Sequence, residues 1–159
     1  MQVSGTMVVT AGRAVARYSG LGWEAALPGL QQHRNWHGCG AFVTAGGEAA
    51  LLVAGGWDTP NLAFLDSAEV LVGGAPGWVF TTPLPRPLAY PRAVSFDNRV
   101  LLLGGGNRPA GGALQSYPDV LVWEAEAEQW TVLGAMLQPR LSHAAATIEL
   151  TQELLSNCS

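Results

Sequence analysis

The sequence contains no lysine, and its eight basic residues are arginines that occur singly along the chain. Binding to a nucleic-acid backbone needs clustered positive charge, so these arginines and the formal net charge of −4 argue against a nucleic-acid ligand. Charged residues make up only 13% of the chain, against roughly 25% in typical soluble domains. Because hydrophobic residues reach 48%, we expect a folded chain with extensive apolar burial.

Cysteine and long apolar runs are also scarce. The two cysteines, Cys39 and Cys158, are too few for a disulfide framework. No apolar stretch approaches the roughly 18 residues that a membrane span requires, and residues 1–10 lack the charged start of a secretory signal. We therefore expect a soluble, cytoplasmic chain with no membrane partner.

Glycine and proline, in contrast, interrupt short apolar runs throughout, and no segment before the C-terminal end keeps a helical period. Branched and aromatic residues fill these runs, as is typical of half-buried strands. The sequence therefore predicts an all-β chain. The expected strands are 49–54, 67–72, 78–81, 92–96, 99–103, 119–123, 129–133 and 142–148.

Three marks recur in the same order with a period near fifty residues. An aliphatic strand that ends in glycines occurs at 50–56 and again at 100–106. A second strand follows each, and then a tryptophan, Trp78 or Trp130, with Trp23 one period earlier. A basic residue opens the next unit, as at Arg34 and Arg140. Such a period predicts a repeat architecture.

This order of marks resembles the kelch repeat, in which each unit forms one four-stranded blade of a β-propeller. The resemblance covers residues 18–148, between an N-terminal segment (1–17) and a C-terminal tail (149–159). It implies a partial blade at about 18–30, full blades at 34–85 and 86–136, and a further partial blade at 140–148. In such a blade, the glycines allow sharp turns and close approach, and the tryptophan packs between blades.

About three blades are fewer than the four to eight of closed propellers. We expect the chain to be a fragment or truncated product of a longer propeller, to pair as a homo-oligomer, or to fold poorly until further repeats complete it. These alternatives remain open. The tail from residue 149 no longer alternates, and we expect coil or one helical turn there.

Several residues are of types that can form binding or catalytic sites. Gly104, Gly105 and Gly106, with Gly111 and Gly112 beyond, fit no phosphate-binding motif and favour a turn. His33, His37 and Cys39 share one face if their segment is extended, but a fourth zinc ligand is lacking, so we predict packing roles. Glu124, Glu126 and Glu128 favour a solvated strand face and turn. We assign no catalytic, cofactor-binding or metal residue, and no cofactor.

The resemblance implies a protein-interaction module with a protein partner and no enzymatic activity. We expect the loops at 57–65 and 107–117 to carry binding, since loops on a rigid scaffold commonly do. Kelch proteins include substrate-recognition parts of ubiquitin ligases, which implies such a role within a larger protein. The alternatives are a propeller enzyme of the galactose oxidase type, with Tyr18, Tyr90 and Tyr117 as the tyrosines present, or a nonfunctional truncated product.

Overall fold

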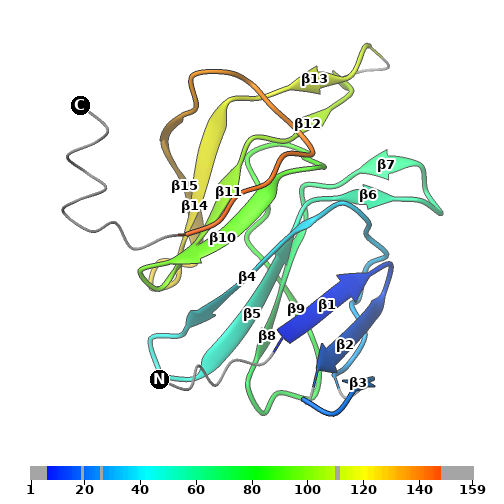
Figure 1. Ribbon diagram of the computed structural model, residues 1–159, viewed down its shortest axis with the longest axis vertical. Helices are drawn as coiled ribbons and strands as arrows, with labels where there is room; N and C mark the ends of the chain where they lie inside the picture. Colours follow the sequence, from blue (N-terminus) through cyan, green and yellow to red (C-terminus); the bar gives the residue numbers. More distant parts are fainter. Residues whose placement is uncertain (1–6, 19, 26, 110–111, 148–159) are drawn as a thin grey trace.

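The computed structural model describes residues 7–18, 20–25, 27–109 and 112–147, and its ordered elements are all β-strands. Three antiparallel sheets follow one another along the chain, and two short hairpins project from one end of the molecule (Figure 1). The expectation of an all-β chain is confirmed. Among the described residues, no helix has the length and apolar character needed to cross a membrane. The expected tail at 149–159, with Cys158, lies outside the described residues.

The first sheet has three strands, and the second and third have four each. Every strand pairs with its neighbour in an antiparallel register. The first sheet contains β1 (Met7–Ala11), β2 (Ala14–Tyr18) and β3 (Trp23–Glu24). The second contains β4 (Gly38–Val43), β5 (Ala49–Ala54), β8 (Ala68–Val72) and β9 (Val79–Thr81). The third contains β10 (Arg92–Phe96), β11 (Arg99–Leu103), β14 (Asp119–Glu124) and β15 (Gln129–Ala135).

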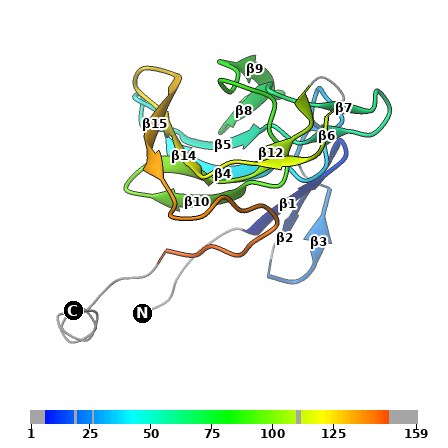
Figure 2. The same cartoon turned by 90° about the horizontal axis from the view of Figure 1, so that it is seen from above.

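The expected loops at 57–65 and 107–117 are more ordered than the sequence indicated. Most of each segment forms a two-stranded hairpin, whose two strands hydrogen-bond to each other. The first hairpin is β6 (Trp57–Asp58) with β7 (Ala63–Phe64), and the second is β12 (Gly106–Asn107) with β13 (Gln115–Ser116). The two hairpins lie at the same end of the molecule, seen in both Figure 1 and Figure 2.

The core lies between successive sheets. One cluster, which includes Val15, Val53 and Trp78, joins the first sheet to the second. A larger one, which includes Leu52, Leu102 and Trp123, joins the second to the third. Glycines of β4 permit the close approach there, because a Cβ at Gly38 would meet the Leu102 side chain at 2.3 Å. We call these two contact regions the first and second boundaries.

Paired glycines turn the chain out of the second strand of each four-stranded sheet. Gly55 and Gly56 have φ angles of +67° and +107°, and Gly104 and Gly105 have +62° and +98°. L side chains rarely adopt these angles, so glycine is required. Gly55 therefore corresponds to Gly104, one residue earlier than the sequence comparison of 55–56 with 105–106 indicated. Gly106 instead pairs within β12 and corresponds to Trp57.

The remaining strand predictions were mixed. Strands β5, β10 and β11 coincide with the expected 49–54, 92–96 and 99–103. The strand expected at 142–148 was wrong over its described part, because residues 142–147 form no strand. No neighbouring strand pairs with that segment among the described residues, and a strand needs such a partner for its backbone groups. The sequence also gave no sign of β1 and β2, which lie in the segment treated as N-terminal to the repeats.

Candidate functional site

A hollow of about 320 Å³ lies between the two hairpins. Its lining is mostly aromatic and carries one charged side chain. The lining residues are Trp36, Trp57, Phe64, Tyr90, Arg108 and Leu114. We call this the hairpin hollow. The lining offers aromatic rings and one guanidinium, but no carboxylate or thiol. These groups suit binding through ring contacts and charge.

The aromatic rings form two pairs, one from a hairpin and one from the starts of two repeats. Trp57 and Phe64 meet edge to face across β6 and β7, with ring centroids 4.9 Å apart. Trp36 stacks on Tyr90, also at 4.9 Å and with 25° between the ring planes. Trp36 is 54% exposed, so this stack presents a large ring to solvent. Pairs of this kind contribute about 0.5–1.5 kcal/mol beyond burial, which favours a preformed wall.

Backbone geometry places Trp36 and Tyr90 at equivalent points of successive repeats. Both have left-handed φ angles, +53° and +61°, and Ser142 in the next repeat has +52°. The Tyr90 amide donates to the Trp36 carbonyl at 2.8 Å, and the Ser142 amide donates to the Tyr90 carbonyl at 3.2 Å. A non-glycine residue in this region is under strain of order 1 kcal/mol, and such strain concentrates at functional sites. The three residues thus form a strained, hydrogen-bonded row at the hairpin end.

A buried ion pair fixes the segment that presents Trp36. Arg34 and Glu69 are both fully buried, and Arg34 Nη2 donates to Glu69 Oε1 at 2.7 Å. Arg34 Nη1 also donates to the carbonyls of Gly55 and Ser67. Burial lowers the pKa of Arg34, while its hydrogen bond to Glu69 opposes that shift. Because the guanidinium donates to Glu69 of β8 and to Gly55 and Ser67, which adjoin β5 and β8, the start of this repeat is held firmly against the second sheet.

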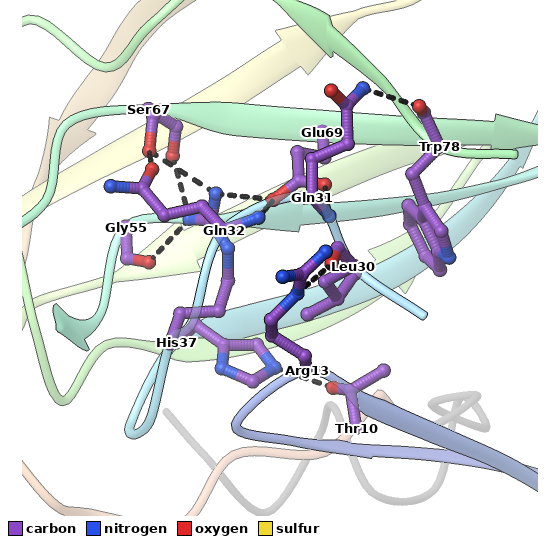
Figure 3. A network of polar contacts seen from close by, with 11 residues as sticks. Thr10, Arg13, Leu30, Gln31, Gln32, His37, Gly55, Ser67, Glu69 and Trp78 are labelled. Carbon is purple, nitrogen blue, oxygen red and sulfur yellow. Dashed lines mark hydrogen bonds and ion pairs between the residues drawn. The ribbon is translucent and has the colours of Figure 1, made fainter. Parts of the chain in front are cut away.

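Glu69 also satisfies the backbone that precedes Arg34, as the polar network in Figure 3 shows. Its two carboxylate oxygens accept from the amides of Gln31, at 2.7 Å, and Gln32, at 3.2 Å. The Gln31 side chain donates in turn to the Trp78 carbonyl. A buried carboxylate is tolerated only when its oxygens are satisfied in this way. The network therefore has a positioning role beneath the hairpin hollow.

Each hairpin has a buried polar residue at the same position, the second residue of its first strand. Asp58 of β6 is 2% exposed, and its Oδ2 accepts from Asn61 Nδ2 at 2.7 Å. This bond lowers the pKa of Asp58. Asn107 of β12 is 8% exposed; it donates to the Pro87 carbonyl and accepts from the Tyr117 hydroxyl. Asn107 thus ties the second hairpin to the link that contains Pro87, whereas the Asp58 bond closes the first hairpin on itself.

A second, smaller hollow of about 70 Å³ lies against the same stacked rings. Its lining adds a histidine and an arginine to the shared aromatic wall. The lining residues are Trp36, His37, Tyr90, Pro91, Arg92 and Ser142. Burial and the neighbouring Arg34 charge lower the pKa of His37 to about 4. His37 is therefore neutral at pH 7, and Arg92 supplies the charge of this hollow.

The structure brings His37 and Cys39 together at Thr10 of β1, but His33 lies apart from them, because the chain turns at Trp36 instead of running extended. His37 Nε2 contacts the Thr10 hydroxyl at 2.5 Å, whereas His33 Nδ1 lies 4.0 Å from Asp58 Oδ1. Burial raises the pKa of the Cys39 thiol. In the described part of the chain, no group of three or more side chains is arranged to hold a metal ion.

The other residues weighed from the sequence lie away from the hollow or serve turns. Gly104 and Gly105 form the turn described above, and Gly106 lies in β12, while Gly111 is outside the described residues. Glu126 and Glu128 are exposed at the turn between β14 and β15, and Glu124 forms an ion pair with Arg99 at 3.3 Å. These three glutamates therefore occupy the solvated strand end that the sequence indicated.

Sequence reasoning found the right segments for the hollow but missed its central wall. Trp57, Phe64, Arg108 and Leu114 fall within the two loops expected to bind, whereas Trp36 and Tyr90 were assigned no binding role. The sequence carries no clear signal for these two aromatic residues, because only the structure shows that Trp36 and Tyr90 are equivalent, each two positions after Arg34 or Leu88. The six side chains come from two successive repeats, so they meet only when these repeats pack together.

Of the three comparisons with known proteins, the search of solved structures found matches. No protein-family model matches the sequence, and no curated protein matches it. A solved structure described as "Structure of YjhT" is similar with a TM-score of 0.63 and 15% sequence identity. The likeness covers 82% of this chain and 41% of that one, so the chain spans less than half of that structure's length. At this identity the likeness concerns the fold alone, and it agrees with the all-β architecture.

Proposed function

We propose that the chain is part of a kelch-type β-propeller and that its sheets are successive blades. Two observations support this proposal. The second and third sheets have the same strand order and the same paired-glycine turn. Each is also followed in the chain by a residue with a left-handed φ angle, Tyr90 after the second sheet and Ser142 after the third. A tryptophan at the outer strand of each of these sheets also donates to the preceding link: Trp78, directly before β9, to the Pro28 carbonyl, and Trp130 of β15 to the Thr82 carbonyl. Such regular contact between units is what a propeller requires, with further repeats or a second copy completing it.

The function that we propose for this module is protein binding at its hairpin end. The hairpin hollow carries this proposal, because hairpins from two successive sheets converge on one aromatic-walled site. Tryptophan, tyrosine and arginine are the residues enriched where protein interfaces gain most of their affinity. The hollow is also open at the end of the molecule, and the exposed Trp36 and Leu114 leave it accessible to a protruding segment. A role in recognition within a larger protein, such as a ubiquitin-ligase adaptor, would use the same surface.

The test is a selection of displayed random peptides against the immobilised chain. A variant with Trp57→Ala and Phe64→Ala, which removes one aromatic pair, serves as the counter-screen. We expect enriched peptides that bind the unmodified chain and lose at least about tenfold in affinity on the variant, since aromatic contact residues commonly contribute over 1 kcal/mol. Matching circular dichroism spectra would exclude unfolding as the cause.

Two results would contradict the proposal. One is the failure of the selection to enrich any peptide above the counter-screen. The other is a set of peptides that binds both forms equally, which would place the contact surface elsewhere on the molecule.

A further inference from the structure

The two hollows at the hairpin end are positively charged on a chain that is acidic overall. The sequence has 12 acidic and eight basic residues. Arg108 lines the hairpin hollow and Arg92 lines the smaller one, and neither lining includes a carboxylate. The charge of both linings is therefore opposite in sign to the net charge of the chain. Complementary charge across an interface favours the matching partner and suppresses others.

Arg108 belongs to the half of the eight arginines for which the described residues provide no acidic partner. Four arginines form ion pairs with nearby carboxylates. These pairs are Arg17 with Glu24, Arg34 with Glu69, Arg86 with Asp119, and Arg99 with Glu124. Within residues 7–18, 20–25, 27–109 and 112–147, no carboxylate lies at ion-pair distance from the exposed Arg108. Its guanidinium is free to pair with a ligand.

The arrangement of the hollows suits an extended chain better than a compact small molecule. Trp36 and Tyr90 form a wall that both hollows share, with their rings 4.9 Å apart. In an extended peptide, side chains two residues apart project on one side at a spacing of about 6.6–6.8 Å. Two such side chains can straddle the stacked rings. The larger hollow has room for a large apolar side chain, and the smaller one for a small side chain.

We propose that the hairpin end binds an extended acidic peptide segment of a partner protein. A large apolar side chain of that segment fills the hairpin hollow, and an adjacent carboxylate pairs with Arg108. The smaller hollow accepts a side chain two residues away, beside Arg92. This inference rests on the proposed function and adds to it the chemical class of the partner.

The test uses peptides from the display selection, each remade with every Asp as Asn and every Glu as Gln. Affinities are measured by fluorescence anisotropy for the unmodified chain, Arg108→Gln and Arg99→Gln. The last variant is the matched control, because it removes the same charge from an exposed arginine on β11, outside both hollows. Arg108→Gln changes an exposed residue, so folding is not at risk.

We expect the selected peptides to be rich in Asp and Glu and to weaken when these are neutralised. Arg108→Gln should weaken binding about threefold to fivefold, as the loss of an exposed ion pair does, while Arg99→Gln should leave it unchanged. Affinity should also fall as salt rises, and the fall should be smaller for Arg108→Gln.

Each remaining outcome has a distinct meaning. Peptides that need Trp57 and Phe64 but show no acidic excess would overturn this inference and leave the proposed function standing. The same holds for acidic peptides that bind Arg108→Gln and the unmodified chain equally well. Failure to select any peptide at the hairpin end would overturn both proposals.

Discussion

The two boundaries between successive sheets occupy the same place in the repeat, and both contain an apolar cluster, but the first adds a buried ion pair where the second has two leucines. At the first boundary, Arg34 pairs with Glu69, and both are fully buried. At the second, the equivalent residues are Leu88 and Leu121, which belong to the same apolar cluster and are 2% and 3% exposed. The equivalence follows from strand register, because Glu69 pairs with Val53 as Leu121 pairs with Leu102.

This difference shows that the same backbone arrangement accepts either a buried ion pair or two apolar side chains at the boundary. A buried ion pair and a well-packed apolar pair are often similar in net stability, because the cost of removing charges from water offsets their attraction. The two pairs differ in the hydrogen bonds that they need, because the polar atoms of a buried ion pair must all have partners and an apolar pair has none to satisfy. Gln31 and Gln32, whose amides donate to Glu69, meet part of that demand at the first boundary.

A second difference between the boundaries concerns the residue directly after Trp36 or Tyr90, the two aromatic residues with left-handed φ angles. His37 occupies it at the first boundary and contacts Thr10 of β1, whereas buried Pro91 occupies it at the second. Only the first boundary therefore contains a titratable group at this point. Two of the following predictions depend on this charged character of the first boundary, and the third on the tighter packing of the second.

The largest expected effect comes from giving the first boundary the chemistry of the second. Arg34→Leu or Glu69→Leu alone should lower the free energy of unfolding by about 3–5 kcal/mol, because each leaves one buried charge unpaired. The double variant should be more stable than either single variant. It should still lose about 1–3 kcal/mol, since the amides of Gln31 and Gln32 then lack an acceptor. Urea unfolding of the four proteins measures these values, and strictly additive losses would show that the two side chains do not interact.

A smaller effect is expected from acidification. His37 has a pKa of about 4 in the folded chain, below the ordinary 6.5, so the unfolded chain binds more protons between these pH values. Stability should therefore fall as pH drops from about 6.5 to 4, by about 3 kcal/mol if His37 acts alone. His37→Gln should flatten this dependence in urea unfolding at several pH values. His143, whose pKa is also lowered by burial, provides the matched control in His143→Gln. An unchanged slope in His37→Gln would contradict the assignment.

The smallest expected effect is the difference in stability loss between an alanine substitution at Gly12, at the first boundary, and one at Gly55, at the second. Gly12 has φ of +61°, and a Cβ there would meet only the His33 ring, at 3.2 Å. Gly55 has a similar φ, but its Cβ would lie 2.3 Å from the Leu88 carbonyl oxygen. Gly12→Ala should cost about 1 kcal/mol through φ strain, and Gly55→Ala about 1–3 kcal/mol more through the backbone collision. Thermal melts compare the two variants, and equal losses would show that the second boundary is less tightly packed than the structure indicates.

The sequence was informative where the determining interactions are local. Aliphatic runs followed by glycines predicted β5 and β11 because strand formation and left-handed turns leave a direct mark on residue type. It was misleading at 142–147, where the residues are suitable for a strand but no neighbouring strand pairs with them among the described residues. It was silent about Arg34 and Glu69 as a pair, since they lie 35 positions apart and meet only when two units pack.

The sequence by itself determined that the chain is all-β and that its strand-and-glycine marks recur about fifty residues apart, because spacing, glycine turns and apolar alternation are properties of short segments. The tertiary structure alone decided where Trp36, Tyr90 and Arg108 lie relative to the hairpins. These side chains come from different units, so their contact depends on how the sheets pack and on the strained row that joins the units. The hairpin hollow is for this reason a product of packing between repeats and not of any single motif.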